Sequence, residues 1–128
     1  MILAETTVAI DFLRTPTPRL LKIIQDNHAA ICGVTVAEIF AGAKAVADLA
    51  RYTAALSVFS TAAIPDSIWQ VLGRNLFALR RRGITVPFAD AIIATVAIES
   101  DLELWTHDAH FTRIQSVLPQ LKLFAEPP

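Results

Sequence analysis

Short apolar runs alternate with segments of helical hydrophobic periodicity along almost the whole chain. The apolar runs predict strands at Ile2–Ala4, Ala30–Gly33, Ser60–Ile64, Glu103–Trp105 and Leu121–Phe124. The segments between them predict helices at Thr6–Leu13, Leu20–Gln25, Thr35–Val46, Asp48–Val58, Pro65–Arg82, Phe88–Ser100 and Ala109–Gln115. Because strands that alternate with helices are typical of parallel sheets, we expect an α/β fold. Its mostly parallel sheet would have about five strands, with helices on both faces.

The length of 128 residues corresponds to one domain, so we interpret residues 1–128 as a single domain. The longest stretch without a charged residue, Tyr52–Pro65, has 14 residues, whereas a membrane-spanning helix needs roughly 20. Glu5 and Asp11 interrupt the region where a secretory signal would need unbroken apolar sequence. The single cysteine, Cys32, excludes a disulfide framework and a cysteine-based zinc site. We therefore expect a cytoplasmic protein.

Acidic residues follow three of the predicted strands. Glu5 comes directly after the first, Glu38 lies just beyond the second, and Asp108 comes three residues after Trp105. Since ligands of open parallel sheets bind outside the carboxyl ends of the strands, these side chains are expected at one edge of the sheet. Asp90 joins them from the start of an almost entirely apolar helix, where an unpaired carboxylate is costly.

Each acid also has a purely structural interpretation. Asp90 would stabilise the first turn of its helix through the helix dipole. Thr35 and Glu38 have the spacing of a capping box. Asp108 would cap the helix that follows it. Hydroxyl groups beside the acids would either cap helices or hold the carboxylates in place, and they belong to Thr6, Thr7 and Thr106.

The charge balance favours a metal site. Four carboxylates in one cleft repel each other unless divalent cations neutralise them, and a site made only of carboxylates suits Mg²⁺ or Mn²⁺ rather than Zn²⁺. The whole chain has a formal charge of −1, from 11 basic and 12 acidic residues. Without the four acids, 8 acidic residues remain against 11 basic ones, and this remainder carries +3. An acidic centre in a mildly basic chain suits a metal-dependent enzyme that acts on a phosphate backbone. Only four glycines occur, and the Gly-rich nucleotide-binding loops are absent.

Four segments, in this order and at this spacing, resemble the PIN-domain family, specifically its VapC-type toxins. They are MILAETTVAIDFLR around Glu5, TVAEIFAGA around Glu38, LRRRGITVPFADAIIATVA around Asp90 and LWTHDAHF around Asp108. The resemblance implies a Mg²⁺- or Mn²⁺-dependent endoribonuclease that cleaves RNA such as tRNA or rRNA. It further implies a homodimer that a protein antitoxin silences.

The resemblance maps the family's acidic motif onto Glu5, Glu38, Asp90 and Asp108, which would hold the metal and carry catalysis. Thr6 and Thr106 occupy the family's hydroxyl positions. In this mechanism a bound ion lowers the pKa of water and stabilises charge on the phosphodiester transition state.

Glu5 departs from the family, which ordinarily has aspartate at this position. The additional methylene moves the carboxylate by roughly 1.3–1.5 Å on a fixed backbone, and a misplacement of 1 Å can cost about a hundredfold in rate. Glu5 therefore binds metal in a repacked arrangement, favours Mn²⁺, or marks a weakened nuclease. The alternative function is a PIN-fold module that binds RNA or an antitoxin without efficient cleavage.

Basic residues are candidate contacts for RNA or an acidic antitoxin segment, and they are Arg14, Arg80, Arg81, Arg82 and His110. The arginines at the end of the Pro65–Arg82 helix would equally complement its dipole. His107, Asp108 and His110 suggest a transition-metal site, but no further ligand of that kind is evident. Asp11 is interpreted as a salt-bridge partner, with Arg14 as one candidate.

The apolar composition suggests a buried partner surface. Hydrophobic residues make up 54% of the chain and the mean hydropathy is +0.50. The helices Pro65–Arg82 and Thr35–Val46 are expected to contribute to a homodimer or antitoxin surface. The apolar residues that suggest this are Trp69, Leu72, Leu76, Phe77 and Leu79.

A receiver or phosphohydrolase domain fits less well. The first needs a lysine at a late strand end, where Lys122 fits poorly, and the second needs Asp-x-Asp after its first strand.

Overall fold

Four parallel strands form the central sheet in a computed structural model that describes all 128 residues. They are β1 (Ile2–Ala4), β2 (Ala30–Cys32), β3 (Ser60–Ala62) and β4 (Glu103–Trp105), in the order β3-β2-β1-β4. The fifth predicted strand, Leu121–Phe124, contributes only an isolated parallel bridge between Leu104 and Leu123. The sheet is therefore close to the expected one, and its outermost strand is reduced to one bridge.

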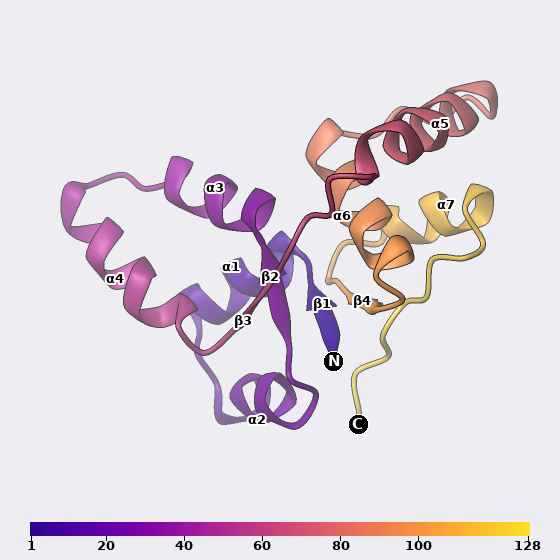
Figure 1. The fold of residues 1–128 in the computed structure, drawn as a ribbon. Coiled ribbons are helices and arrows are strands. Elements are labelled where there is room, and N and C mark those ends of the chain that lie inside the picture. Colours follow the sequence, from indigo (N-terminus) through magenta and orange to yellow (C-terminus); the bar gives the residue numbers. More distant parts are fainter.

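Seven helices cover the two faces of this sheet (Figure 1). They are α1 (Thr6–Arg14), α2 (Pro18–Asp26), α3 (Gly33–Ala41), α4 (Val46–Leu56), α5 (Ile68–Arg81), α6 (Phe88–Glu99) and α7 (His110–Val117). Figure 1 shows α1, α2 and α4 on one side of the strands and α5, α6 and α7 on the other. The single α/β domain is thus the predicted one, with helices on both faces.

Each face of the sheet has its own hydrophobic core, because successive strand residues point to opposite faces. Leu3 and Leu104 pack into the core on the side of α5, α6 and α7. Their neighbours Ile2 and Trp105 pack into the core on the side of α1 and α2. With both faces covered, β1 is almost wholly buried, and the polar groups at its carboxyl end lie in a crowded interior.

Helix α6 is the central element of the first core. Its run from Ala91 to Ala97 is buried, in agreement with its apolar sequence on all sides. The only polar side chain in that run, Thr95, donates to the Ala91 carbonyl at 2.7 Å and accepts from the Asn75 side chain at 3.0 Å. The helix is therefore a fixed support for Asp90 in its first turn.

The predicted capping box of Thr35 and Glu38 is wrong. Helix α3 starts at Gly33, two residues earlier than predicted, and Cys32 is its N-cap. Thr35 therefore lies inside the helix, and its buried hydroxyl faces Thr6 at 3.2 Å. The predicted Thr35–Val46 helix is also too long, because α3 ends at Ala41 and α4 begins at Val46.

The apolar residues of α5 divide between the core and the surface. Leu72 and Leu79 are buried in the first core, so they are not available to a partner. Trp69 and Phe77 are 56% and 63% exposed, and Phe88 at the start of α6 is 58% exposed. No helix has the length and apolar character needed to span a membrane.

Replacing Ile93 with alanine tests the importance of α6. Ile93 is fully buried, so Ile93→Ala is expected to lower the free energy of unfolding by about 2–5 kcal/mol. Val46→Ala is the matched control, because Val46 is 85% exposed and its loss should cost less than about 0.5 kcal/mol. Chemical denaturation measures both values. Equal destabilisation by the two variants would contradict the assignment of α6 to the core.

Candidate active site

The strand order places the candidate site at the carboxyl end of β1. From β1 the chain builds outward to β2 and β3 in one direction, and only later adds β4 on the other side. In open parallel sheets, the point where the order reverses is where ligands bind. Glu5 follows β1 directly and its backbone N–H donates to the Trp105 carbonyl at 2.8 Å, so it lies at this point between β1 and β4.

Glu5 is buried, with only 2% of its surface exposed. Its Oε1 atom accepts hydrogen bonds of 2.5 Å from the hydroxyls of both Thr7 and Thr106. These hydroxyls in turn accept from backbone N–H groups, Thr7 from His107 at 3.0 Å and Thr106 from Asp108 at 2.9 Å. Because each hydroxyl has a single hydrogen, these backbone bonds fix the direction in which it points at Glu5.

The Oε2 atom of Glu5 accepts no hydrogen bond from any protein group. One oxygen of this buried carboxyl group is therefore committed to the protein and the other is free to bind a further group.

Glu38 is held by a third threonine, Thr6. Thr6 donates to its Oε1 atom at 2.7 Å, and the hydroxyl of buried Thr35 packs against Thr6 on the other side. Thr6 lies in the first turn of α1 and Glu38 in α3, so this contact joins the segments that follow β1 and β2. Glu38 itself is exposed and its second oxygen has no partner.

Asp108 lies in the turn after β4 and has a helix-capping role, one of its two interpretations from the sequence. Its Oδ1 atom accepts from the backbone N–H of His110 at 2.9 Å, and the His110 ring lies 3.4 Å away. The other oxygen, Oδ2, accepts no hydrogen bond. The contact with His110 uses one oxygen of Asp108 and leaves the other free to bind a further group.

The pKa of Asp90 shows that the four acids share one electrostatic environment. Burial, which is the largest cause, and the charges of Glu5, Glu38 and Asp108 together raise the pKa of Asp90 from 3.8 to about 6. His110 opposes this shift. Asp90 has no hydrogen-bond donor of its own, so only the charge of His110 offsets part of this repulsion. The folded chain thus brings Glu5, Glu38 and Asp108, which come from three other segments, within electrostatic range of Asp90.

This donor set fits a hard divalent cation in its chemistry. Every candidate ligand is a carboxylate, and each of the four has at least one oxygen without a hydrogen-bond partner. No three His, Cys, Asp or Glu side chains converge closely enough to coordinate one ion. Mutual repulsion favours this separation, because like charges lower their energy by moving apart.

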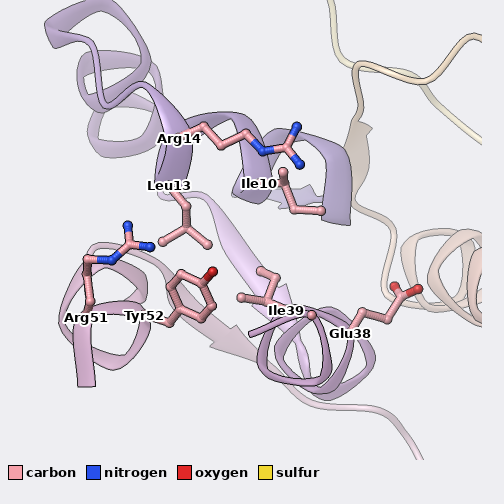
Figure 2. A pocket seen from close by; sticks show the side chains of 8 residues that line it. Ile10, Leu13, Arg14, Glu38, Ile39, Arg51 and Tyr52 are labelled. Carbon is pink, nitrogen blue, oxygen red and sulfur yellow. The ribbon is translucent and has the colours of Figure 1, made fainter. Parts of the chain in front are cut away.

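Arg14 lines a pocket of about 330 Å³ beside the acids, between α1, α3 and α4 (Figure 2). Ile10 and Leu13 of α1 face Ile39 and Tyr52 across it, and Glu38 lies at its edge toward the acid cluster. Arg51 gives the pocket a second cation.

The other predicted basic contacts lie on the opposite side of the acids. His110 and Arg113 of α7 line a smaller cavity of about 150 Å³ that reaches Asp90. Arg80, Arg81 and Arg82 are exposed at the end of α5, and the segment 83–87 leads from there to α6 (Figure 1). Arg81 contacts the Phe77 ring, with 5.8 Å from its guanidinium carbon to the ring centre.

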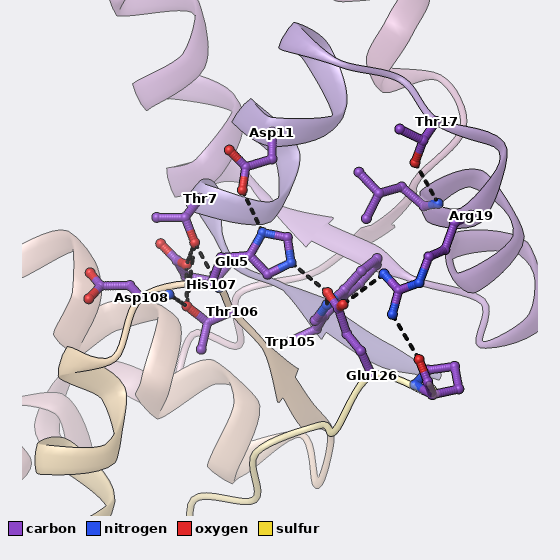
Figure 3. A network of polar contacts seen from close by, with 12 residues as sticks. Glu5, Thr7, Asp11, Thr17, Arg19, Trp105, Thr106, His107, Asp108 and Glu126 are labelled. Carbon is purple, nitrogen blue, oxygen red and sulfur yellow. Dashed lines mark hydrogen bonds and ion pairs between the residues drawn. The ribbon is translucent and has the colours of Figure 1, made fainter.

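His107 belongs to an ion-pair network that the sequence does not reveal (Figure 3). Its Nδ1 atom lies 2.5 Å from Asp11 and its Nε2 atom 2.5 Å from Glu126. Burial lowers the pKa of His107, but the hydrogen bonds to Asp11 and Glu126 outweigh it and raise this pKa above 6.5. Asp11 is thus a salt-bridge partner as expected, but of His107 and not of Arg14. With both ring nitrogens engaged, His107 is unavailable for the transition-metal site that its spacing suggested.

The sequence matches the PIN domain family over residues 2–117. The chain belongs to the PIN-domain family. Its fold resembles that of VapBC2 from Rickettsia felis bound to promoter DNA, with a TM-score of 0.80 and 21% identity over 97% of this chain and 98% of that one. It also resembles DNA-bound VapBC from Salmonella typhimurium, with a TM-score of 0.81 and 20% identity over 97% and 98% of the two chains.

A toxin–antitoxin complex from Klebsiella pneumoniae is similar as well, with a TM-score of 0.66 and 26% identity over 99% and 100% of the chains. No curated protein sequence matches this chain significantly.

Replacing Asp90 with asparagine tests the repulsion within this PIN-domain site. Because folding raises the pKa of Asp90, its contribution to stability is complete below pH 3.8 and is lost as the pH rises through about 6. Asp90→Asn removes this pH-dependent loss, so it should raise the Tm of the metal-free protein at pH 7.5. A gain of roughly 1 kcal/mol corresponds to about 3–6 °C in a chain of this size.

Thermal unfolding in EDTA at pH 7.5 and pH 4 measures the effect, and the gain should shrink at pH 4. Asp66→Asn is the control, since Asp66 is exposed and outside the cluster. A Tm for Asp90→Asn equal to or below that of the wild type at pH 7.5 would refute the repulsion.

Proposed function

We propose that this protein is a metal-dependent endoribonuclease, a VapC-type toxin that hydrolyses RNA phosphodiester bonds and is inhibited by a cognate antitoxin. The proposal rests on the buried carboxyl group of Glu5 at the carboxyl end of β1, and on the nearness of Asp90 to Glu5, Glu38 and Asp108, whose charges raise its pKa. Proteins of this family are nucleases and generally use divalent metal ions. The similar structures from Rickettsia felis and Salmonella typhimurium are VapBC complexes, which supports an antitoxin partner.

In this proposal Glu5, Glu38, Asp90 and Asp108 hold Mg²⁺ or Mn²⁺ through their free oxygens. When bound, such an ion lowers the pKa of water and offsets the negative charge that develops on the phosphodiester. The threonine hydroxyls fix the carboxyl groups before substrate arrives. Thr6 orients Glu38, while Thr106 holds the first oxygen of Glu5 so that the second faces the site.

The surroundings of the acids suggest how partners bind. His110, at the cavity beside Asp90, is placed to contact an RNA phosphate. Arg14 lies at the mixed polar and apolar pocket next to Glu38, which suits a side chain of an antitoxin segment better than a phosphate. Arg80, Arg81 and Arg82 would extend the RNA or antitoxin contact along α5. The exposed Trp69 and Phe77 on the same helix favour a homodimer or antitoxin surface there.

A catalytically weak binding module is the second candidate. It is favoured by the two threonine hydroxyls that hold Glu5 Oε1 and by the separation of the four acids. In this case the protein binds RNA or antitoxin and cleaves poorly, because glutamate at position 5 misplaces its carboxyl group.

Cleavage of RNA by the purified chain decides between these functions. Wild type is expected to cleave RNA with Mg²⁺ or Mn²⁺ and to stop when EDTA is added. Asp90→Asn should lower the cleavage rate at least about a hundredfold. It removes one anionic metal ligand, and even a 1 Å displacement of a catalytic group can lower a rate by about that factor. RNA cleavage that EDTA does not inhibit would contradict a metal-dependent nuclease.

Glu5→Asp separates the two candidates. If wild type is inactive and Glu5→Asp cleaves RNA, the protein is a disabled nuclease and its function is binding. If wild type is active, faster cleavage by Glu5→Asp shows that glutamate limits the rate, and slower cleavage shows that Thr7 and Thr106 are adapted to it. Thermal unfolding confirms that each variant is folded.

A further inference from the structure

We infer that Glu126 is a positioning residue for the acid cluster: it holds the ring of His107, and His107 holds the turn that carries Thr106 and Asp108. This inference rests on the proposed nuclease function for its effect on rate. The contacts of Glu126 do not depend on that function and can be measured separately.

Glu126 makes polar contacts with three side chains, which belong to Arg19, Trp105 and His107 (Figure 3). Its Oε1 atom accepts from the indole Nε1 of Trp105 at 2.8 Å and lies 2.5 Å from Nε2 of His107. Its Oε2 atom accepts from Nη1 of Arg19 at 3.0 Å. Arg19 also donates to the Pro127 carbonyl at 2.8 Å, so two anchors fix this segment against α2.

His107 transmits this anchor to the acids. Its ring lies between Glu126 and Asp11, which fixes it from two sides. Its backbone N–H donates to Thr7, one of the two hydroxyls that hold Glu5. His107 stands directly between Thr106 and Asp108, so any rotation of its backbone moves the hydroxyl that contacts Glu5 and the neighbouring carboxyl group together.

Glu126 itself touches none of the four acids. The rest of its segment is held by the bridge at Leu123 and by contact of Phe124 with Trp105, whose ring centres are 5.8 Å apart. These contacts attach the segment to β4 but do not reach the turn after β4, which α1 supports through Asp11 and Thr7. Glu126 is therefore the group that joins this segment to the turn, and it acts on the acids through His107.

The test compares Glu126→Ala with Glu126→Gln in the full chain. Alanine should lower kcat for Mn²⁺-dependent RNA cleavage about tenfold or more, since small displacements of catalytic groups have large rate costs. KM should stay within about twofold, because Glu126 is not placed to touch RNA. Glutamine should retain most of the activity, because its amide oxygen still accepts from Trp105 and His107.

Lys122→Gln is the matched control. It removes an exposed ion pair with Asp101 in the same segment, 2.7 Å long, and should leave kcat unchanged. If Glu126→Ala does not fold, Glu126→Asp replaces it, because aspartate keeps the charge but withdraws the carboxyl group by one methylene.

Two further measurements do not depend on cleavage. The chain has two tryptophans, so its ¹H–¹⁵N spectrum has two indole signals. Glu126→Ala should shift the signal of Trp105 upfield and leave that of Trp69 in place, and glutamine should restore it. Mn²⁺ affinity, measured by electron paramagnetic resonance, should fall several-fold in Glu126→Ala and remain close to wild type in Glu126→Gln.

An unmoved indole signal in Glu126→Ala would show that the contact does not form, and would overturn the inference. A moved signal with wild-type kcat and Mn²⁺ affinity would also overturn it, because Glu126 would then be only a structural anchor. If wild type cleaves no RNA, the proposed function fails and Mn²⁺ affinity decides the inference alone. A lower Mn²⁺ affinity in Glu126→Ala but not in Glu126→Gln supports the inference, and an unchanged affinity in Glu126→Ala refutes it.

Discussion

Burying a carboxyl group at the end of the central strand is the constraint around which this structure is organised. Glu5 follows β1, which has helices over both faces, so its side chain has almost no access to solvent. An unpartnered carboxylate in such a place is strongly destabilising, and the structure supplies hydroxyls from α1 and from the turn after β4. Holding Glu5 therefore also fixes how two of the segments around the site approach each other.

The two threonine hydroxyls that bind Glu5 are themselves held by further contacts. Thr7 and Thr106 each use their only hydrogen on Glu5 and accept from backbone N–H groups in the turn after β4. That turn is itself tied through His107 to Asp11 and Glu126. The network thus runs from a surface segment to the interior, and every side-chain polar atom that is fully enclosed by protein has a hydrogen-bond partner. Asp90, by contrast, has neighbouring carboxyl groups but no hydrogen-bond donor, and its pKa is raised.

Sequence periodicity predicted most elements because their causes are local. Helix α6 is apolar on every side and is buried as expected, and β1 and β4 are found at their predicted residues. The capping box at Thr35 was wrong because a tertiary contact competed with it: Thr35 meets Thr6, and α3 begins earlier. The outermost strand is reduced to one bridge, because its backbone pairs with β4 only at Leu104. Leu72 and Leu79 looked like partner-facing residues, yet they are buried in the core where α5 packs against α6 and α7.

The sequence by itself determined the residue types, the alternation of strands and helices, and the order of the acids along the chain. These follow from side-chain chemistry and from hydrophobic period, which act over a few residues. Only the tertiary structure decided that Glu5, Glu38, Asp90 and Asp108 share one electrostatic environment, and which hydroxyl holds which carboxyl group. It also decided that Glu126 reaches Arg19, 107 residues away. Such contacts depend on strand order and on the packing of distant segments, and no local pattern encodes either.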